Sequence, residues 1–370
     1  MTFNETLTKL RAHLHTNPSP ASWNQICDFF DQLPADCELQ TFLDYANTHL
    51  NTWPDHLRLA QPHWRPRLKR GGEPGRWSLV RTIVLNHKHL GSRELERLIS
   101  PTLDHLTTLD LSHNLLDDVC AELIAEAPSF NNLTAVAIAH NIVGSKGFAA
   151  LLSGDALPHL SHLSISHNRI DERGPQLITQ QAQHPPLTHL QIGGNHLGDN
   201  GLKQLSSLPW FSQLVALDCA DTGLYKNSAE TISVSLERSR KIAFLNLSNN
   251  PLSDRLIDSL LNTSNPFSHL KVLLLRNCKL SSDGLETLFR HRPSWLTTLT
   301  HLDLSHNLIG DRSAQLLAKT DPLPALRELD LSANRISPET CEQLIASELA
   351  SRVKLTLSQD LSWDGLLAQQ

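Results

Sequence analysis

One spacing of aliphatic residues recurs ten times along this 370-residue chain and limits what it can fold into. An aliphatic residue is followed by another three residues later, a third two residues after that, often an Asn three further on, and an aliphatic residue two beyond it. The first place is filled by Val80, Leu106, Leu133, Leu160, Leu187, Leu214, Ile242, Leu270, Leu299 and Leu326. These places are 26 to 29 residues apart, and such a period is the signature of a repeat architecture.

Each repeat is predicted to contain a strand, a turn and a helix. Aliphatic residues two apart, such as Leu109 and Leu111, place both side chains on one face of a strand. A stretch with helical spacing follows, clearest at Leu202, Leu205 and Leu208 and at Leu285, Leu288 and Phe289. Loops that reverse into the helix are expected at Gly198-Asp199-Asn200-Gly201, Ser282-Asp283-Gly284 and Gly310-Asp311.

No repeat can bury the apolar face of its helix alone, so neighbouring repeats must stack. Strands in a sheet lie ~4.8 Å apart whereas packed helices need ~8–10 Å, so the stack must curve with the strands inside. The predicted fold class is therefore α/β, a solenoid or horseshoe with an inner parallel β-sheet and outer helices, preceded by a helical N-terminal cap. A degraded eleventh unit is expected at Arg352, with Leu355, Leu357 and Asp360 at the later places.

The Asn at the ninth place of the repeat is predicted to be structural. It stands at Asn114, Asn141, Asn168, Asn195, Asn250, Asn307 and Asn334. A polar side chain flanked by core residues must find partners, and the backbone of the turn that it starts is within reach. Lys88, Thr222 and Cys278 replace the Asn, so looser or altered turns are expected in the first, sixth and eighth units.

These residues resemble the leucine-rich repeat family, and the helical units of 27–29 residues resemble its ribonuclease-inhibitor-like subfamily. The segment LKVLLLRNCKLSSDGLETL is a close match to that subfamily, including Cys in the place of Asn. The resemblance covers roughly residues 77–360 and implies a leucine-rich-repeat solenoid. Members of the family are mostly protein-recognition surfaces, so the resemblance implies protein binding as the function.

Residues 1–75 lack the repeat and carry three apolar stripes at helical spacing, interrupted at Asn17-Pro18 and at Pro34. Two hypotheses fit this segment: a packed helical cap, or a small recognition module with Trp53, Trp64 and Trp77 as its anchors. We therefore predict three parts: this cap or module at 1–75, ten repeats at 76–351, and a degenerate terminal unit with a C-terminal cap at 352–370. Trp363, Leu366 and Leu367 are expected to cover the last repeat.

Composition narrows the partner and the compartment. The net charge of -6 is spread along the chain, which favours neither a nucleic acid nor a membrane partner. Arg65, Arg67, Lys69, Arg70 and Arg76 form the only basic cluster, and the Gly and Pro residues among them indicate a solvated linker. Six dispersed cysteines, no secretory signal and no apolar run of membrane-spanning length predict a cytoplasmic protein, expected to be a monomer.

No motif for a nucleophile, a metalloenzyme or a phosphate loop is present, so the protein is predicted to be no enzyme and to need no cofactor. Histidine is the one unusual count, at 20. His87, His113, His140, His167 and His306 occupy the eighth place of their units. Stacked imidazoles could bind a metal, but no carboxylates accompany them, so solvated histidines without a metal are expected.

A partner-binding patch is predicted in the seventh and eighth units. Most units fill the outward places of the strand with small or polar residues, whereas these two units carry Phe244, Val272 and Leu274 there. Asn246, Lys271 and Arg276 complete the patch. Apolar residues inside a polar rim are typical of an interface hot spot. The structural alternative is that the neighbouring Trp210-Phe211 segment folds over them.

The predicted function is a non-enzymatic scaffold that binds a protein partner on the concave face. The alternative is a regulator of an enzyme, such as a GTPase-activating protein or a ubiquitin-ligase-type effector. Some ribonuclease-inhibitor-like proteins are GTPase activators, but no residue here matches theirs, and the catalytic Cys domain of the ligase effectors is not found in this sequence.

Overall fold

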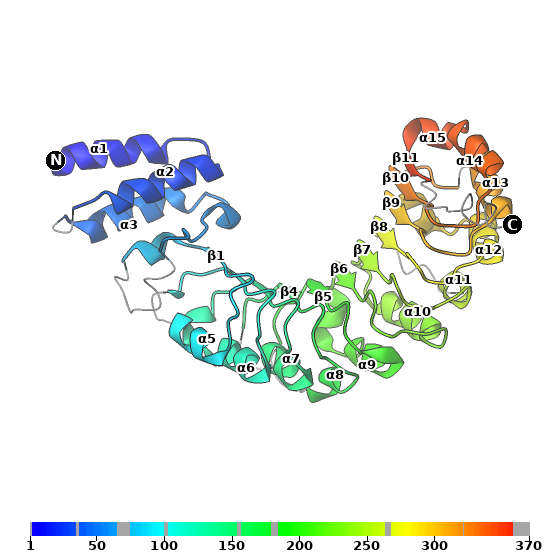
Figure 1. Cartoon of the computed structure of the whole chain (residues 1–370), viewed down its shortest axis with the longest axis horizontal. Coiled ribbons are helices and arrows are strands. Elements are labelled where there is room, and N and C mark those ends of the chain that lie inside the picture. The colour runs from blue at the N-terminus through cyan, green and yellow to red at the C-terminus, as the bar shows by residue number, and fades with distance from the viewer. Residues whose placement is uncertain are drawn as a thin grey trace, which may run out of the picture. The chain divides into compact units, whose positions relative to one another are not determined.

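The computed structural model describes residues 2–34, 37–64, 75–99, 103–153, 157–178, 184–262, 268–320 and 322–357. In these residues eleven strands of three residues each pair in parallel, in sequence order, to form one sheet. A helix follows each of the first ten strands (Figure 1). The predicted α/β solenoid and its strand, turn and helix units are therefore confirmed.

The chain forms two compact units, Met1–Ser164 with Ala182–Pro186, and Ile165–Gln181 with Leu187–Gln370. The first contains α1 (Phe3–Leu14), α2 (Pro20–Asp31), α3 (Leu39–Leu50), η1 (Asp55–Leu57), η2 (Gly75–Leu79), β1 (Thr82–Val84), α5 (Ser92–Leu98), β2 (Thr108–Asp110), α6 (Asp118–Glu126), η4 (Pro128–Phe130), β3 (Ala135–Ala137), α7 (Ser145–Leu152) and β4 (His162–Ser164). Elements marked η are 3-10 helices.

The second unit begins with α8 (Gly174–Leu177), β5 (His189–Gln191), α9 (Gly198–Leu205), η5 (Pro209–Gln213), β6 (Ala216–Asp218), α10 (Ser228–Arg238), β7 (Phe244–Asn246) and α11 (Arg255–Leu261). It continues with β8 (Val272–Leu274), α12 (Ser282–His291), η6 (Ser294–Thr298), β9 (His301–Asp303), α13 (Asp311–Thr320), β10 (Glu328–Asp330), α14 (Pro338–Ile345), α15 (Glu348–Arg352) and β11 (Lys354–Thr356). Within this unit the strands line the inner side of an arc and the helices its outer side (Figure 1).

The helices α1 to α3 confirm the three helices predicted near the N-terminus. Ser19 caps α2 by accepting from the Ser22 amide, and Pro20 occupies the first helical position, where its missing N–H costs nothing. The proposed anchors Trp53, Trp64 and Trp77 are instead core residues, with exposed fractions of 6%, 2% and 4%. The hypothesis that they anchor a partner is therefore wrong.

Buried polar contacts join these helices to the first repeat. The guanidinium of Arg58 is 1% exposed and donates to the carbonyls of Leu79 and Leu50 and to the Asn47 side chain. Burial lowers the pKa of Arg58 to about 10. Leu59 forms a parallel bridge with Thr82 of β1. The domain bounds at 75 and 351 stay predictions, and Trp363, Leu366, Leu367 and Asp360 lie outside the described residues.

The start of the helices differs from the prediction in detail. Gly198 to Gly201 form the first turn of α9, and Ser282 to Gly284 the first turn of α12, so neither segment is a loop before the helix. In α12, Ser281 is the cap that accepts from the Asp283 amide. Leu208 is buried but lies beyond the end of α9. Helical spacing located the helices, whereas their ends depend on capping side chains that the spacing ignores.

The Asn side chains hydrogen-bond the backbone of two adjacent turns. Asn307 is 4% exposed, and its Oδ1 accepts from the amides of Cys278 and Leu280 in the preceding repeat, at 3.0 Å each. Its Nδ2 donates to the carbonyls of Leu275, Leu304 and Ser305. Asn114, Asn141 and Asn250 repeat this arrangement. The side chain thus supplies partners for groups that the turn itself cannot pair.

The turns that lack Asn keep the left-handed residue before the ninth place but differ in the residue after it. The residue before the ninth place is left-handed in all ten turns: His87, His113, His140, His167, Gly194, Asp221, Asn249, Asn277, His306 and Ala333. The amides of Lys88, Thr222 and Cys278 are held by the Asn of the following repeat. Thr222 and Cys278 are buried and bond nearby carbonyls themselves. The residue after the ninth place is also left-handed in these three turns, at His89 (φ 51°), Gly223 (φ 73°) and Lys279 (φ 60°), so the replaced turns have the altered backbone that was expected.

Candidate functional site

The strand face of the second unit carries two rows of side chains. In β7 to β10 the middle residue is a buried Leu, so the first and third residues of each strand point to the opposite face. Register aligns the first residues across β7 to β11 and likewise the third residues. The first row is Phe244, Val272, His301, Glu328 and Lys354. The second row is Asn246, Leu274, Asp303, Asp330 and Thr356.

The predicted patch occupies the β7 and β8 end of these rows. Phe244, Asn246, Val272 and Leu274 are half-buried on the strand face. Lys271 and Arg276 are exposed and lie directly before β8 and two residues after it. Because Phe244 pairs with Val272 and Asn246 with Leu274, the structure brings together residues that are 28 apart in sequence. Trp210 and Phe211 lie in η5 and are themselves buried.

A groove extends this patch toward β11 and includes residues that the sequence prediction missed. It has a volume of about 360 Å³ and is lined by Val272 and Leu274 together with the row residues of β9 to β11. The sequence prediction did not single out His301, Asp303, Glu328 or Asp330, although they occupy the same places of the repeat as Val272 and Leu274. The shared place in the repeat was the signal that could have identified them.

In each carboxylate of the second row, one oxygen accepts a hydrogen bond from a backbone amide of the turn that follows the strand. Asp303 Oδ1 accepts from the Ser305 amide at 2.8 Å, and Asp330 Oδ1 accepts from the Ser332 amide at 2.8 Å. Asn246 makes the same contact with the Ser248 amide at 3.1 Å. Among the described residues, nothing donates to the second oxygen of Asp303 or Asp330. These oxygens therefore keep their capacity to accept.

The tautomer of His301 follows from its neighbour. Thr300 Oγ1 donates to the Lys271 carbonyl at 3.0 Å and lies 2.9 Å from His301 Nδ1. When the single hydroxyl proton is given to the carbonyl, Oγ1 accepts from Nδ1. In the neutral ring Nε2 is then the acceptor. The groove thus contains carboxylate oxygens and an imidazole lone pair beside aliphatic carbon.

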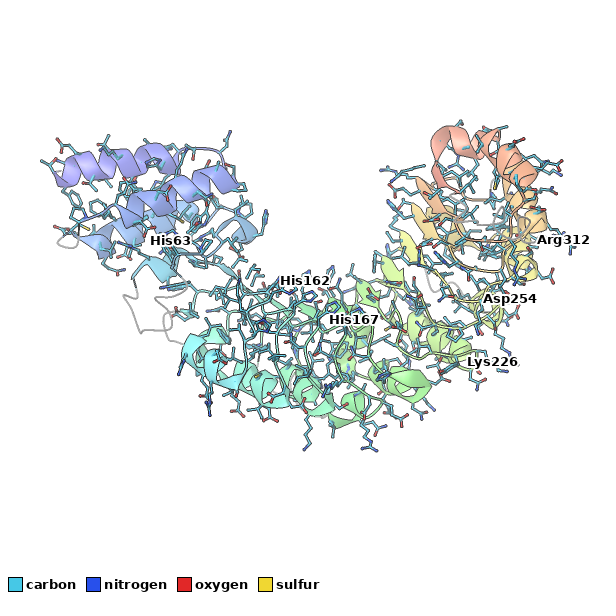
Figure 2. All side chains as sticks on the ribbon, viewed as in Figure 1. His63, His162, His167, Lys226, Asp254 and Arg312 are labelled. Atoms are coloured by element: carbon cyan, nitrogen blue, oxygen red, sulfur yellow. The ribbon has the colours of Figure 1, made fainter. Side chains whose placement is uncertain are left out.

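Several charges on the helical side are paired within the fold. Arg312 Nε lies 2.7 Å from Glu286 Oε1, and Glu286 also binds Arg290. Asp254 accepts from the Ser281 amide at 2.8 Å. Figure 2 shows Asp254 and Arg312 on the helical side of the second unit. The groove differs from the helical side. Among the described residues, Lys354 contacts the carboxylate of Glu328 at 3.5 Å, but no Lys or Arg forms an ion pair with Asp303 or Asp330.

The histidines of the eighth place line the turns, where they are exposed as predicted. Within the first unit the rings of His87 and His113 stack at 4.3 Å, and those of His113 and His140 at 4.2 Å. Their left-handed φ values of 54° to 57° were not predicted, although His, Asn and Asp are the non-glycine residues enriched in that conformation. Backbone conformation thus accounts for the residue types at this place.

Part of the basic cluster lies outside the described residues, namely Arg65, Arg67, Lys69 and Arg70. Its remaining member, Arg76, is not a solvated linker residue, because its Nη1 binds Asp31 Oδ1 at 2.7 Å and its side chain is 15% exposed. Asp31 also accepts from the indole of Trp64. The prediction of a solvated linker is therefore wrong at Arg76.

A model of the family described as "Leucine Rich repeat" matches residues 103–125, 156–174, 183–206 and 296–318. These segments lie in the repeats that contain β2, β4, β5 and β9, and the structure adds the remaining repeats at the same period. The chain is a leucine-rich-repeat protein. Its repeats are of the ribonuclease-inhibitor-like type.

Two curated relatives show how far the likeness extends. "NACHT, LRR and PYD domains-containing protein 14" of Mus musculus is 34% identical over 150 residues, covering 39% of this chain and 15% of that protein. "Ribonuclease inhibitor" of Mus musculus is 30% identical over 140 residues, covering 37% of this chain and 30% of that protein. This leucine-rich-repeat chain therefore matches less than a third of the length of either relative.

A solved chain in "Crystal structure of TLR13-ssRNA13 complex" covers 76% of this chain and 36% of its own length, at 19% identity and a TM-score of 0.45. That score is too low to support a conclusion. In the part of the leucine-rich-repeat chain that the structure describes, no helix has the length and apolar character needed to cross a bilayer.

Proposed function

We propose that this leucine-rich-repeat protein is a non-enzymatic scaffold that binds a protein partner on the strand face of β7 to β11. The observation that carries the proposal is the apolar cluster of Phe244, Val272 and Leu274 on a face that β2 to β6 fill with small or polar residues. A half-buried aromatic and aliphatic cluster beside Lys271 and Arg276 has the composition of a binding hot spot. The groove next to it gives a partner a recess of about 360 Å³.

Thiol chemistry supports a binding role over catalysis. Burial raises the pKa of the Cys278 thiol to about 12 and that of Cys120 to about 11, so neither is a thiolate near neutral pH. All six cysteines are free thiols. Free, mostly buried thiols suit a reducing compartment, and we include a cytoplasmic location and a monomeric state in the proposal.

The N-terminal segment is proposed to be a cap. Its tryptophans are buried, and Arg58 joins α3 to the residues that precede β1. A cap of this kind covers the end of the stack, where the core would otherwise meet water. The segment 352–370 is proposed to do the same at the other end.

A double substitution tests the binding face. Phe244→Ala with Arg276→Ala should weaken binding of the partner captured from the source cell by at least ~2 kcal/mol, because hot-spot side chains dominate interface energy. Affinity would be measured by calorimetry and folding by thermal melting. The control is Thr108→Ala with Ala135→Ser, which alters the equivalent face of β2 and β3. Unchanged affinity in a cooperatively melting double variant would place the binding site elsewhere.

A further inference from the structure

The groove of β8 to β11 combines aliphatic side chains with the second carboxylate oxygens of Asp303 and Asp330, which accept from no described residue. Its apolar end is Val272 and Leu274. Across the second row, Leu274 pairs directly with Asp303, and Asp303 with Asp330. Adjacent strands are ~4.8 Å apart, so an aliphatic side chain and two carboxylates follow one another over about 10 Å.

In the part of the chain that the structure describes, no cation neutralises the carboxylates of Asp303 and Asp330. Lys354 contacts Glu328, which belongs to the first row. Arg276 places Nη1 3.4 Å from the Ser305 hydroxyl. Among the described residues, no Lys or Arg forms an ion pair with Asp303 or Asp330. A ligand that brings donors and positive charge would therefore complement this part of the groove.

A guanidinium fits this arrangement better than an ammonium. It is planar, always charged, and presents several N–H donors in a fixed fork, so it can bridge two carboxylates on adjacent strands. Asp303 in β9 and Asp330 in β10 supply two such carboxylates, and the Nε2 atom of His301 in β9 is a further acceptor when Nδ1 carries the proton. The aliphatic stem of an Arg side chain would lie over Leu274, as long cationic side chains cover apolar surface. Lys271 and Arg276 disfavour a cation at the β7 and β8 end.

We infer that this groove binds an Arg side chain of the partner, placed over β9 and β10, with an aliphatic or aromatic side chain of the same segment against Phe244, Val272 and Leu274. The inference rests on the proposed binding function and specifies the chemistry of the partner. The occupant is a protein segment in which an Arg adjoins an apolar residue.

The test uses a random library of 12-residue peptides displayed on phage and selected on the immobilised full chain. The wild type should enrich peptides with Arg next to Leu, Ile or Phe. The double variant Asp303→Asn with Asp330→Asn should lose that enrichment. Asn246 already makes the same amide contact in β7, so the exchange removes charge and leaves the turn capped. The matched control is Asp110→Asn with Asp218→Asn, which alters carboxylates that cap their own turns outside the groove.

One selected peptide is then synthesised with fluorescein and measured by anisotropy. Replacing its Arg by Gln should weaken binding at least about tenfold, and replacing it by Lys should weaken it less, because charge-assisted hydrogen bonds to two carboxylates are lost in the first case. Rising salt should weaken the wild type and the control but change the Asp303→Asn, Asp330→Asn variant little. Equal affinity of the Arg and Gln peptides would contradict the inference.

Failure of the inference is distinguishable from failure of the proposed function. Peptides that lose binding to the Phe244→Ala, Arg276→Ala variant but bind the Asp303→Asn, Asp330→Asn variant as well as the wild type would overturn the Arg site and leave the binding face standing. Peptides indifferent to both variants would overturn both. Melting curves of each variant check that the fold is retained.

Discussion

Two regions of each repeat differ in how much their residues vary. One is the turn edge, formed by the eighth and ninth places of the repeat, and the other is the strand face, formed by the first and third residues of each strand. At the turn edge a left-handed residue precedes Asn in seven of ten repeats, and the left-handed residue is present even where Asn is not. On the strand face the aligned residues range from Phe244 through His301 to Lys354. Backbone groups that need partners constrain the first region. On the strand face such a need acts on the third residue of a strand, where Asn246, Asp303 and Asp330 accept from turn amides, and the first residue is left open to vary.

Removing the side chain of Asn307 should give the largest effect on stability. Asn307→Ala deprives the buried amides of Cys278 and Leu280 of their acceptor, at a cost of ~1–3 kcal/mol in the free energy of unfolding. The measurement is urea denaturation. Thr356→Ala on the strand face is the control and should stay near the wild type. A variant as stable as the wild type would show that the turn edge is no more constrained than the face.

Changing the left-handed residue should have a smaller effect. His113 has a φ of 57°, a conformation that disfavours a β-branched side chain by roughly 1–2 kcal/mol. His113→Val should therefore lower the midpoint of thermal unfolding, whereas His113→Asn should be close to neutral because Asn tolerates this φ. Equal midpoints for the two variants would mean that ring stacking, and not backbone conformation, selects histidine here.

Metal addition should have the smallest effect. The rings of His87, His113 and His140 are stacked within 20° of parallel, so the lone pairs in their planes do not converge on one point. In the described residues no group of three His, Cys, Asp or Glu is placed to hold a metal. Zinc or nickel should leave the melting temperature unchanged. A stoichiometric rise that a chelator reverses would make the turn edge a ligand site in addition to the strand face.

Period and hydrophobic spacing were sufficient to predict the fold. They located the strands of the ten repeats and of the eleventh unit, and the paired places of Leu109 and Leu111 predicted which residues are buried. They could not predict the left-handed turns, since a φ value leaves only a weak compositional trace such as Ser-His-Asn. Helix ends also escaped, because the contact between Ser281 and the Asp283 amide depends on geometry.

The proposed binding face was only partly predictable. Phe244, Val272 and Leu274 were noticeable because they break the polar pattern of their places. Asp303 and Asp330 follow that pattern, and their shared groove with Leu274 arises from register across repeats. Which ring nitrogen of His301 accepts depends on the Thr300 hydroxyl, which lies between His301 Nδ1 and the Lys271 carbonyl. Such properties belong to pairs of residues and cannot be read from single positions.

The Asn contacts also have a polarity along the chain. Each Oδ1 accepts from amides of the repeat before its own, as Asn250 does from Thr222 and Leu224, so protection against amide hydrogen exchange is supplied by the C-terminal neighbour. Loss of one Asn should then accelerate exchange of the turn amides in the preceding repeat. The turn amides of the following repeat should change little. In the turn of Asn195, which is followed by Thr222 in place of Asn, exchange should already be faster than in the turn of Asn114, because the Thr222 hydroxyl is bonded to the Cys219 carbonyl.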